Sequence, residues 1–168
     1  MKQIRIIGFL LFILTVNSSS AQQLRSYKGQ ALFIYNFTKH IKWQLNAPVF
    51  NIGILGKSDV FIELSNNLKG KVVDSRTMEV KALNSLEEAS QCQIVYLPTS
   101  RSKDLPSLLA LAGAKGILII TEDDLASKGA GISFLLVEDK LRFKINEEVL
   151  VKNGLQVSGG LLSLAVKI

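Results

Sequence analysis

The chain has 168 residues, with 20 Lys and Arg against 14 Asp and Glu, a formal net charge of +6 and a single Cys. A single Cys excludes an internal disulfide, and this length suits one domain that buries its own core. The basic residues are scattered and form no Lys/Arg block interleaved with aromatic residues. This pattern argues against nucleic acid as a partner.

Residues 1–21 have the layout of a cleavable secretory signal peptide. Two basic residues open the chain, residues 6–16 are almost all apolar, and residues 17–21 are small and polar. Cleavage is expected after Ala21. A retained membrane anchor is the alternative, but the apolar run falls short of the about 20 residues that cross a bilayer core. We therefore expect an exported chain over residues 22–168 with no membrane span.

Residues 26–43 are predicted to form a helix with a wide apolar face. Its main stripe consists of Tyr27, Ala31, Ile34, Tyr35, Thr38 and Ile41. A second stripe of Phe33 and Phe37 flanks it, so the helix is covered on two sides or one flank is an interface. Four aromatic residues exceed what one helix–sheet contact needs and are the candidate partner-binding residues. They are Phe33, Tyr35, Phe37 and Trp43.

The middle of the chain alternates short apolar runs with short helices. Strands are expected over residues 49–56, 78–83, 92–97 and 116–121. Helices are expected over residues 59–68, from residue 85 and over residues 103–112. Strands that are apolar on both sides and separated by helices indicate a mainly parallel sheet with helices on both faces.

The last third of the chain breaks this alternation. Residues 132–137 and 140–145 have the pattern of two strands divided by two acidic residues, which predicts an antiparallel hairpin. The tail over residues 147–168 is expected to be helical, with a break at Asn153 and Gly154. The expected fold is one α/β domain whose mainly parallel sheet carries an antiparallel hairpin.

Gly56, Lys57 and Ser58 follow an expected strand and precede an expected helix, which is where phosphate-binding loops lie. A nucleotide P-loop also needs Gly five positions earlier, and Asn51 stands there. We therefore expect a tight turn and a helix cap instead of a nucleotide site.

Glu122, Asp123 and Asp124 lie at the carboxyl end of the fourth expected strand, at the edge where open α/β sheets bind ligands. They could hold a cation, or they could cap a short helix over residues 123–127, where acidic side chains oppose the helix dipole. The first expected strand ends without an acidic residue, which favours capping.

The remaining candidate residues have simple interpretations. Cys92 begins an apolar run and is expected to be a buried thiol. His40 is the only His and is expected at the surface, and residues 158–160 are expected to start the last helix. The sequence shows no catalytic set, no cofactor loop and no metal-ligand cluster. We therefore expect a binding or regulatory module instead of an enzyme.

Several segments, in this order, resemble the YfiR family of periplasmic proteins. They are residues 31–39 with Trp43, then 52–56, 70–71, 92–96, 129–132, 141–146, 154–158 and 161–165. The resemblance covers nearly all of the chain after the expected signal peptide. It implies a periplasmic regulatory protein with an α/β domain that often dimerises.

The family's named member represses a membrane-bound diguanylate cyclase through that enzyme's periplasmic part, which lowers cyclic di-GMP output and biofilm formation. The resemblance therefore implies that this chain binds the periplasmic domain of an inner-membrane signalling protein. Two positions depart from the family. Gln44 stands where Pro commonly follows the Trp, and the disulfide that some members form at the Cys92 position is impossible here. Redox control through an internal disulfide does not carry over.

Four residues of the matching stretch are expected to be structural: Arg142, Phe143, Ile145 and Asn146. Phe143 and Ile145 should face the core, and Asn146 should cap the next helix.

A second function also stays open, namely a periplasmic small-molecule binder. Its site would be the strand edge near Gly56, Pro98, Thr99 and Glu122. A hydrolytic enzyme ranks behind both functions, because the sequence offers no nucleophile with a positioned base.

Overall fold

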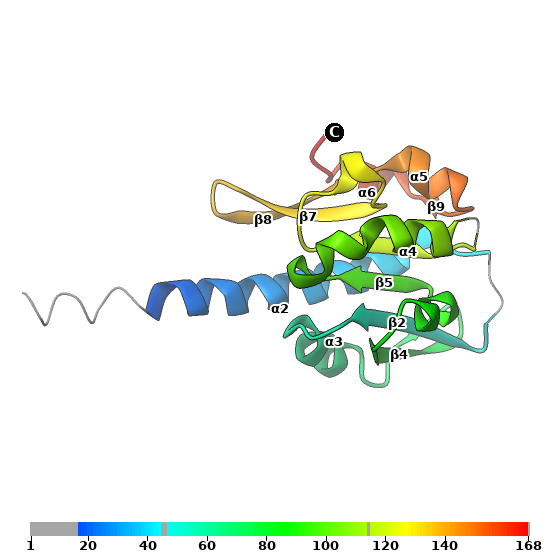
Figure 1. Ribbon diagram of the computed structural model, residues 1–168, viewed down its shortest axis with the longest axis horizontal. Helices are drawn as coiled ribbons and strands as arrows, with labels where there is room; N and C mark the ends of the chain where they lie inside the picture. The colour runs from blue at the N-terminus through cyan, green and yellow to red at the C-terminus, as the bar shows by residue number, and fades with distance from the viewer. Residues whose placement is uncertain (1–16, 45–46, 114, 168) are drawn as a thin grey trace, which may run out of the picture.

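The computed structural model describes residues 17–44, 47–113 and 115–167, which form one mixed α/β domain (Figure 1). Its main sheet has seven strands in the order β3-β4-β2-β5-β6-β7-β8. The five inner strands run parallel: β2 (Val49–Leu55), β4 (Arg76–Leu83), β5 (Ile94–Leu97), β6 (Leu118–Thr121) and β7 (Ile132–Val137). The two edge strands, β3 (Val72–Val73) and β8 (Lys140–Ile145), are antiparallel to their neighbours. The predicted mainly parallel sheet with an antiparallel hairpin is confirmed, and the pair β3–β4 adds a second antiparallel edge.

Helices cover both faces of this sheet. On one face lie α2 (Asn17–His40) and α3 (Val60–Leu68), whose buried side chains share a core with β2, β5 and β6. On the other face lie the 3₁₀ segment η2 (Glu87–Gln91) and α4 (Leu105–Ala112), which close a second core cluster. Both β5 and β6 are buried along their whole length, as expected for central strands covered on two sides.

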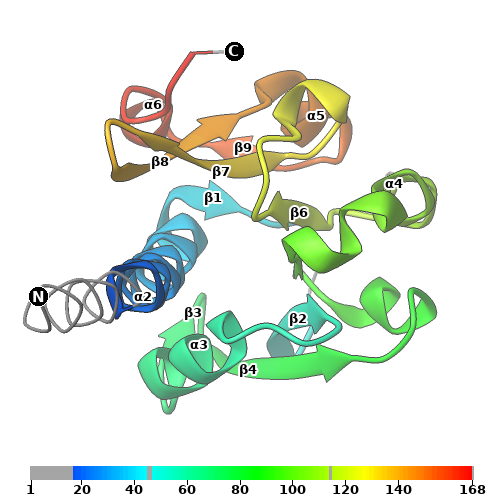
Figure 2. The same ribbon diagram turned by 60° about the vertical axis from the view of Figure 1, so that its left-hand side comes forward.

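The sheet curls around α2. Figure 2 shows α2 with β8 and the C-terminal elements on one side and α3 on the other. The C-terminal elements are α5 (Glu147–Lys152), β9 (Gln156–Val157) and α6 (Gly159–Leu162). Figure 1 shows that the N-terminal part of α2 projects away from the body of the domain.

Three sequence predictions about element boundaries are wrong. The first helix ends at His40 instead of residue 43, because β1 (Ile41–Lys42) pairs antiparallel with β9. The break expected at Asn153 and Gly154 is present, but the strand β9 follows it, and the tail is helical again only over α6; its end lies beside β8, where Val166 N donates to Phe143 O at 2.9 Å. The helix expected over residues 123–127 is a 3₁₀ segment, η4 (Ala126–Lys128).

The hairpin prediction is confirmed residue for residue over β7 and β8. Its two turn residues, Glu138 and Asp139, both adopt positive φ, at 49° and 59°. Such a two-residue turn matches the right-handed twist of the flanking strands.

The predicted apolar segment of the signal peptide, residues 6–16, lies outside the described residues. The expected cleavage point after Ala21 falls within α2. Among the described helices, none combines the length and the apolar character that a bilayer crossing requires.

Cys92 is a buried free thiol, as expected. Its burial raises the pKa of the thiol to about 11. The unfolded thiol loses its proton near pH 9, so the stability that the neutral thiol contributes is complete below pH 9 and is lost as the pH rises to about 11. We expect wild type to lose about 2 kcal/mol more than Cys92→Ala between pH 8 and pH 11. Urea unfolding at both pH values measures this, and equal losses would contradict it.

Candidate functional site

A shallow pocket of about 550 Å³ lies at the carboxyl edge of the main sheet. The loop after β2 contributes Lys57, Ser58 and Asp59, and the chain after β5 contributes Pro98, Thr99 and Ser100. Glu122, which follows β6, and Tyr27 of α2 complete the lining. Three of the four edge residues named from the sequence, Pro98, Thr99 and Glu122, therefore line one pocket.

The pocket lies where the strand order reverses. From β2 the chain crosses through α3 to β4 on one side, and then returns through η2 to β5 on the other side of β2. The loops that follow β2 and β5 therefore leave the sheet in opposite directions, which opens a crevice between them. Open α/β sheets bind their ligands at such switch points.

Buried polar groups lie near the pocket. The Tyr96 hydroxyl donates to Gln30 Oε1 at 2.6 Å, and both side chains are buried. Burial, and then the negative charge of Glu122, raises the pKa of Tyr96 well above its ordinary value. The hydroxyl therefore stays protonated and joins α2 to β5 as a fixed hydrogen-bond donor.

The acidic residues after β6 hold the loop that follows β5. Glu122 Oε2 accepts from Thr99 N at 2.9 Å, and Asp123 Oδ1 accepts from the Thr99 hydroxyl at 2.7 Å. Asp123 Oδ2 also accepts from Ser102 Oγ at 2.5 Å. These bonds secure the start of η3 (Thr99–Asp104). The prediction that the acidic residues cap their own short helix is wrong, because η4 begins later and has no side-chain cap.

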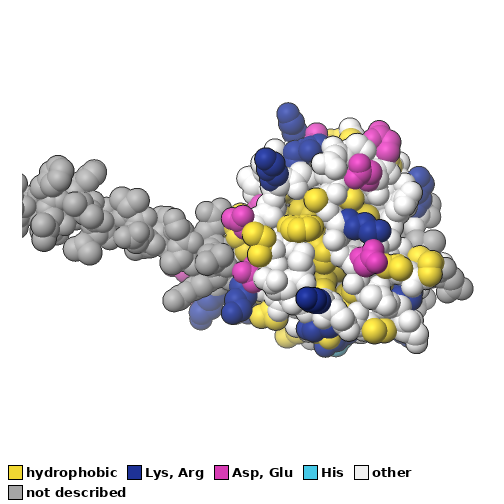
Figure 3. Space-filling view, turned by 90° about the horizontal axis from the view of Figure 1, so that it is seen from below, with side chains coloured by type: hydrophobic (Ala, Val, Ile, Leu, Met, Phe, Trp, Pro, Cys, Tyr) yellow, Lys and Arg dark blue, Asp and Glu magenta, His cyan; other side chains and the backbone are white. Residues whose placement is uncertain are grey.

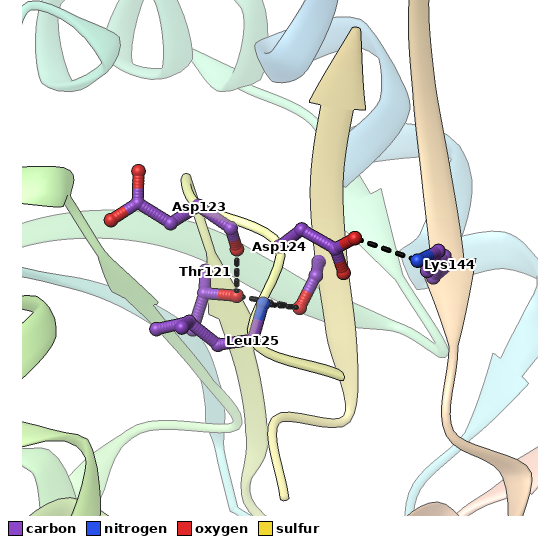
Figure 4. A network of polar contacts seen from close by, with 6 residues as sticks. Thr121, Asp123, Asp124, Leu125 and Lys144 are labelled. Carbon is purple, nitrogen blue, oxygen red and sulfur yellow. Dashed lines mark hydrogen bonds and ion pairs between the residues drawn. The ribbon is translucent and has the colours of Figure 1, made fainter. Parts of the chain in front are cut away.

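A second network fixes the turn between β6 and β7 (Figure 4). The Thr121 hydroxyl donates to Asp123 O and lies 2.7 Å from Ser133 Oγ, which accepts from Leu125 N at 3.1 Å. Ser133 must therefore donate to Thr121. Beside this network, Lys144 Nζ donates to Asp124 Oδ2 at 2.6 Å and ties β8 to the same turn.

We expect Thr121→Val to lower the free energy of unfolding by about 1–2 kcal/mol, because it leaves the buried Ser133 hydroxyl without its acceptor. Thr121→Ser is the matched control, since it keeps the hydroxyl and removes only a methyl group. Chemical denaturation of the three proteins measures the difference. Equal stability of the Val and Ser variants would show that the network contributes nothing.

The loop after β2 is the tight turn and helix cap expected from the sequence. Gly56 has a φ of +85°, a backbone conformation that residues other than Gly rarely adopt. Ser58 Oγ accepts a long hydrogen bond of 3.4 Å from Val60 N at the start of α3.

The structure separates the four candidate partner-binding residues into two groups. Phe37 is fully buried, and Trp43 is 9% exposed and donates its Nε1 to Gln93 O at 3.1 Å. Phe33 and Tyr35 are only partly buried. Of the four candidates, only Phe33 and Tyr35 therefore keep side-chain surface that a partner could contact.

Two structural residues of the family motif, Phe143 and Ile145, are buried as expected, whereas Arg142 is exposed and its expected structural role stays a prediction. Asn146 caps α5, because its Oδ1 accepts from Val149 N at 3.1 Å. Its amide also donates to Ala126 O at 2.9 Å, which links α5 to the turn after β6.

His40 is exposed, as expected, and its Nδ1 lies 3.3 Å from Ser158 Oγ. Ser158 in turn caps α6 by accepting from Leu161 N, which confirms that a turn there starts the last helix. Within the described part of the chain, no three His, Cys, Asp or Glu side chains are grouped so that they could hold a metal ion.

The chain forms a single α/β domain in which the sheet curls around the C-terminal part of α2. A pocket lies at the point where the strand order of the sheet reverses. The family model described as YfiR/HmsC-like matches residues 27–166. The chain belongs to the YfiR/HmsC-like family, which is a family of periplasmic regulatory proteins. A search of curated proteins found no match.

Proposed function

We propose that this protein is a periplasmic regulator that represses a membrane-bound diguanylate cyclase by binding the cyclase's periplasmic domain. The observation that carries the proposal is the family match over residues 27–166. The basic and apolar start of the chain supports it, because a secretory signal would place the domain on the periplasmic side of the membrane.

Location constrains how such a regulator acts. Cyclic di-GMP is made in the cytoplasm, so a periplasmic protein reaches this signal only through a protein that crosses the membrane. Binding lowers the activity of the cyclase only if the regulator prefers the inactive conformation of the cyclase. Each tenfold preference shifts that equilibrium by about 1.4 kcal/mol.

Deletion of the gene tests this function. We expect the cyclic di-GMP level to rise on deletion and to return when the full chain is supplied. A chain that starts at residue 22 is the matched control: without the expected signal peptide it should stay in the cytoplasm and fail to restore repression. An unchanged cyclic di-GMP level, together with crosslinking that recovers no membrane signalling protein, would contradict the proposal.

The pocket favours a second candidate function, the binding of a small molecule. Its volume of about 550 Å³ lies within the range of ligand sites, and it occupies the switch point of the sheet. Ser100 lies in the lining and is exposed, so Ser100→Phe would obstruct part of the pocket without disturbing the core.

A thermal-shift screen against metabolites tests the second function, because a ligand that binds the folded state raises its melting temperature. The shift should disappear in Ser100→Phe and persist in Ser107→Phe, an equally exposed position on α4. If no compound raises the melting temperature, or if both variants respond like wild type, the pocket is not a binding site.

A further inference from the structure

Two lysines share one half-buried aromatic ring on α2. The Nζ of Lys39 lies 4.0 Å from the centre of the Tyr35 ring, and the Nζ of Lys71 lies 3.8 Å from the same centre. Lys39 belongs to the last turn of α2, whereas Lys71 lies in the loop between α3 and β3. The fold thus joins basic residues that are far apart in the chain. The two ammonium groups are at most about 8 Å apart, close enough to act on one ligand.

Neither ammonium group has a carboxylate partner among the described residues. The ion pairs found there join Arg76 to Asp74, Lys81 to Glu79, Arg101 to Asp104 and Lys144 to Asp124. The first acidic residue of the chain is Asp59, so α2 itself supplies no carboxylate. Glu63 of the neighbouring α3 forms no ion pair with either lysine. The positive charge at this surface is therefore not compensated by its immediate neighbours.

The same surface carries apolar side chains that solvent reaches. Leu32, one turn before Tyr35 on α2, is 46% exposed, and Lys39 is also exposed. Tyr35 and Lys71 are half-buried, so they are held in place while part of each remains accessible. Figure 3 shows one face of the domain, on which exposed hydrophobic side chains form a central band with both basic and acidic side chains around it. Tyr is one of the residue types that most often dominate the binding energy of an interface.

We propose that Lys39, Tyr35 and Lys71, with Leu32 beside them, bind an acidic segment of a partner protein. Two carboxylates of the segment would pair with the two ammonium groups that lie over the Tyr35 ring, and an apolar side chain of the segment would pack on Leu32 beside them. This inference rests on the proposed function, since it names the chemistry of the surface that the partner presents. Opposite charges across an interface mainly speed association and select the partner.

A membrane surface fits these observations less well than a protein segment. Attraction to anionic lipid requires a cluster of about four to eight Lys and Arg. Here only two ammonium groups converge on one ring, at most about 8 Å apart. Two charges at this separation suit a partner segment that presents two nearby carboxylates.

The test uses the full chain after export and a hexaglutamate peptide as the probe, followed by the NMR signals of the Tyr35 ring. We expect weak binding that salt diminishes and that shifts these signals. Lys39→Glu with Lys71→Glu should weaken binding at least tenfold, whereas replacing both lysines by Arg should preserve it, because Arg also stacks on aromatic rings. Lys115→Glu and Lys152→Glu together, at two exposed lysines outside this surface, are the control matched for the change of charge.

Three results would overturn the inference. They are no binding of the peptide, equal weakening by Lys115→Glu with Lys152→Glu, or binding of phosphatidylglycerol vesicles in place of the peptide. Should the double Glu variant melt early, Lys39→Gln with Lys71→Gln removes the charge without reversing it.

Complementation of the deletion strain separates this inference from the proposed function. If the deletion raises cyclic di-GMP and the double Glu variant represses as well as wild type, the proposed function stands and this surface is wrong. If the deletion changes nothing but the peptide still needs both lysines, the surface stands and the proposed function is wrong.

Discussion

Phe37→Ala is expected to lower the free energy of unfolding by about 4 kcal/mol, the largest loss among the substitutions considered. Phe37 has no exposed surface and lies where the sheet curls around α2. Its ring centre lies 6.1 Å from that of Phe33, 6.2 Å from that of Phe134 and 5.0 Å from that of Phe143. Truncation removes all three ring contacts and leaves a cavity that the surrounding strands cannot fill.

Urea unfolding followed by far-UV circular dichroism measures this loss. Leu32→Ala on the same helix is the matched control, because Leu32 is 46% exposed and its truncation should cost less than about 0.5 kcal/mol. A loss below about 1.5 kcal/mol for Phe37→Ala would mean that the aromatic cluster contributes far less than its burial implies.

This cluster also explains why the sequence overstated the aromatic surface of the first helix. The helical spacing of Phe33 and Phe37 was visible, and so was the hairpin that carries Phe134 and Phe143. That the hairpin side of the sheet bends to meet α2 depends on the curl of the whole sheet. No local pattern encodes that curl, so the sequence left open whether the stripe of Phe33 and Phe37 is covered by the fold or forms an interface.

Elements with strong local signals were predictable. The hairpin has period-two alternation and a two-residue turn, and both strands match their expected limits. In contrast, β1 and β9 are two residues each, too short to show any period. Each strand exists only because the other pairs with it, so the local sequence could not predict either strand.

The residues of the site differ in the same way: some could be placed from the sequence near them, and others depend on contacts between distant parts of the chain. The positions of Pro98, Thr99 and Glu122 followed from the rule that ligands bind at the carboxyl edge of parallel strands. The role of Asp123 did not, because its partners Thr99 and Ser102 lie on another loop and are joined to it only by the parallel pairing of β5 with β6.

A single helix serves both proposed surfaces. α2 supplies Tyr27 to the pocket and Tyr35 to the lysine surface. Any substitution that loosens the core side of α2 therefore displaces both sites together. Functional tests are informative only with variants such as Lys39→Glu and Ser100→Phe, whose side chains lie outside the core.

The close packing of β2 against its neighbours gives the second large effect. An ideal Cβ at Gly53 would lie 2.5 Å from Leu83 Cδ1 and 2.8 Å from Cys92 Sγ. Leu83 and Cys92 are both buried, so they have little room to move aside. We expect Gly53→Val to lower the free energy of unfolding by about 3 kcal/mol and Gly53→Ala by about 2 kcal/mol, measured by urea unfolding.

The cause of this loss can be isolated with a double-mutant cycle. Leu83→Ala alone should cost about 3 kcal/mol, because it leaves a cavity in the second core cluster. With Leu83→Ala in place, the added methyl group of Gly53→Ala keeps only its close approach to Cys92 Sγ, so the double variant should be more stable than the sum of the two losses by about 1 kcal/mol or more. Gly160→Ala, where a Cβ meets no atom within 4 Å, should be nearly neutral. Additive losses in the cycle would locate the cost of Gly53→Ala in its contact with Cys92 or in the backbone of β2, and not in its contact with Leu83.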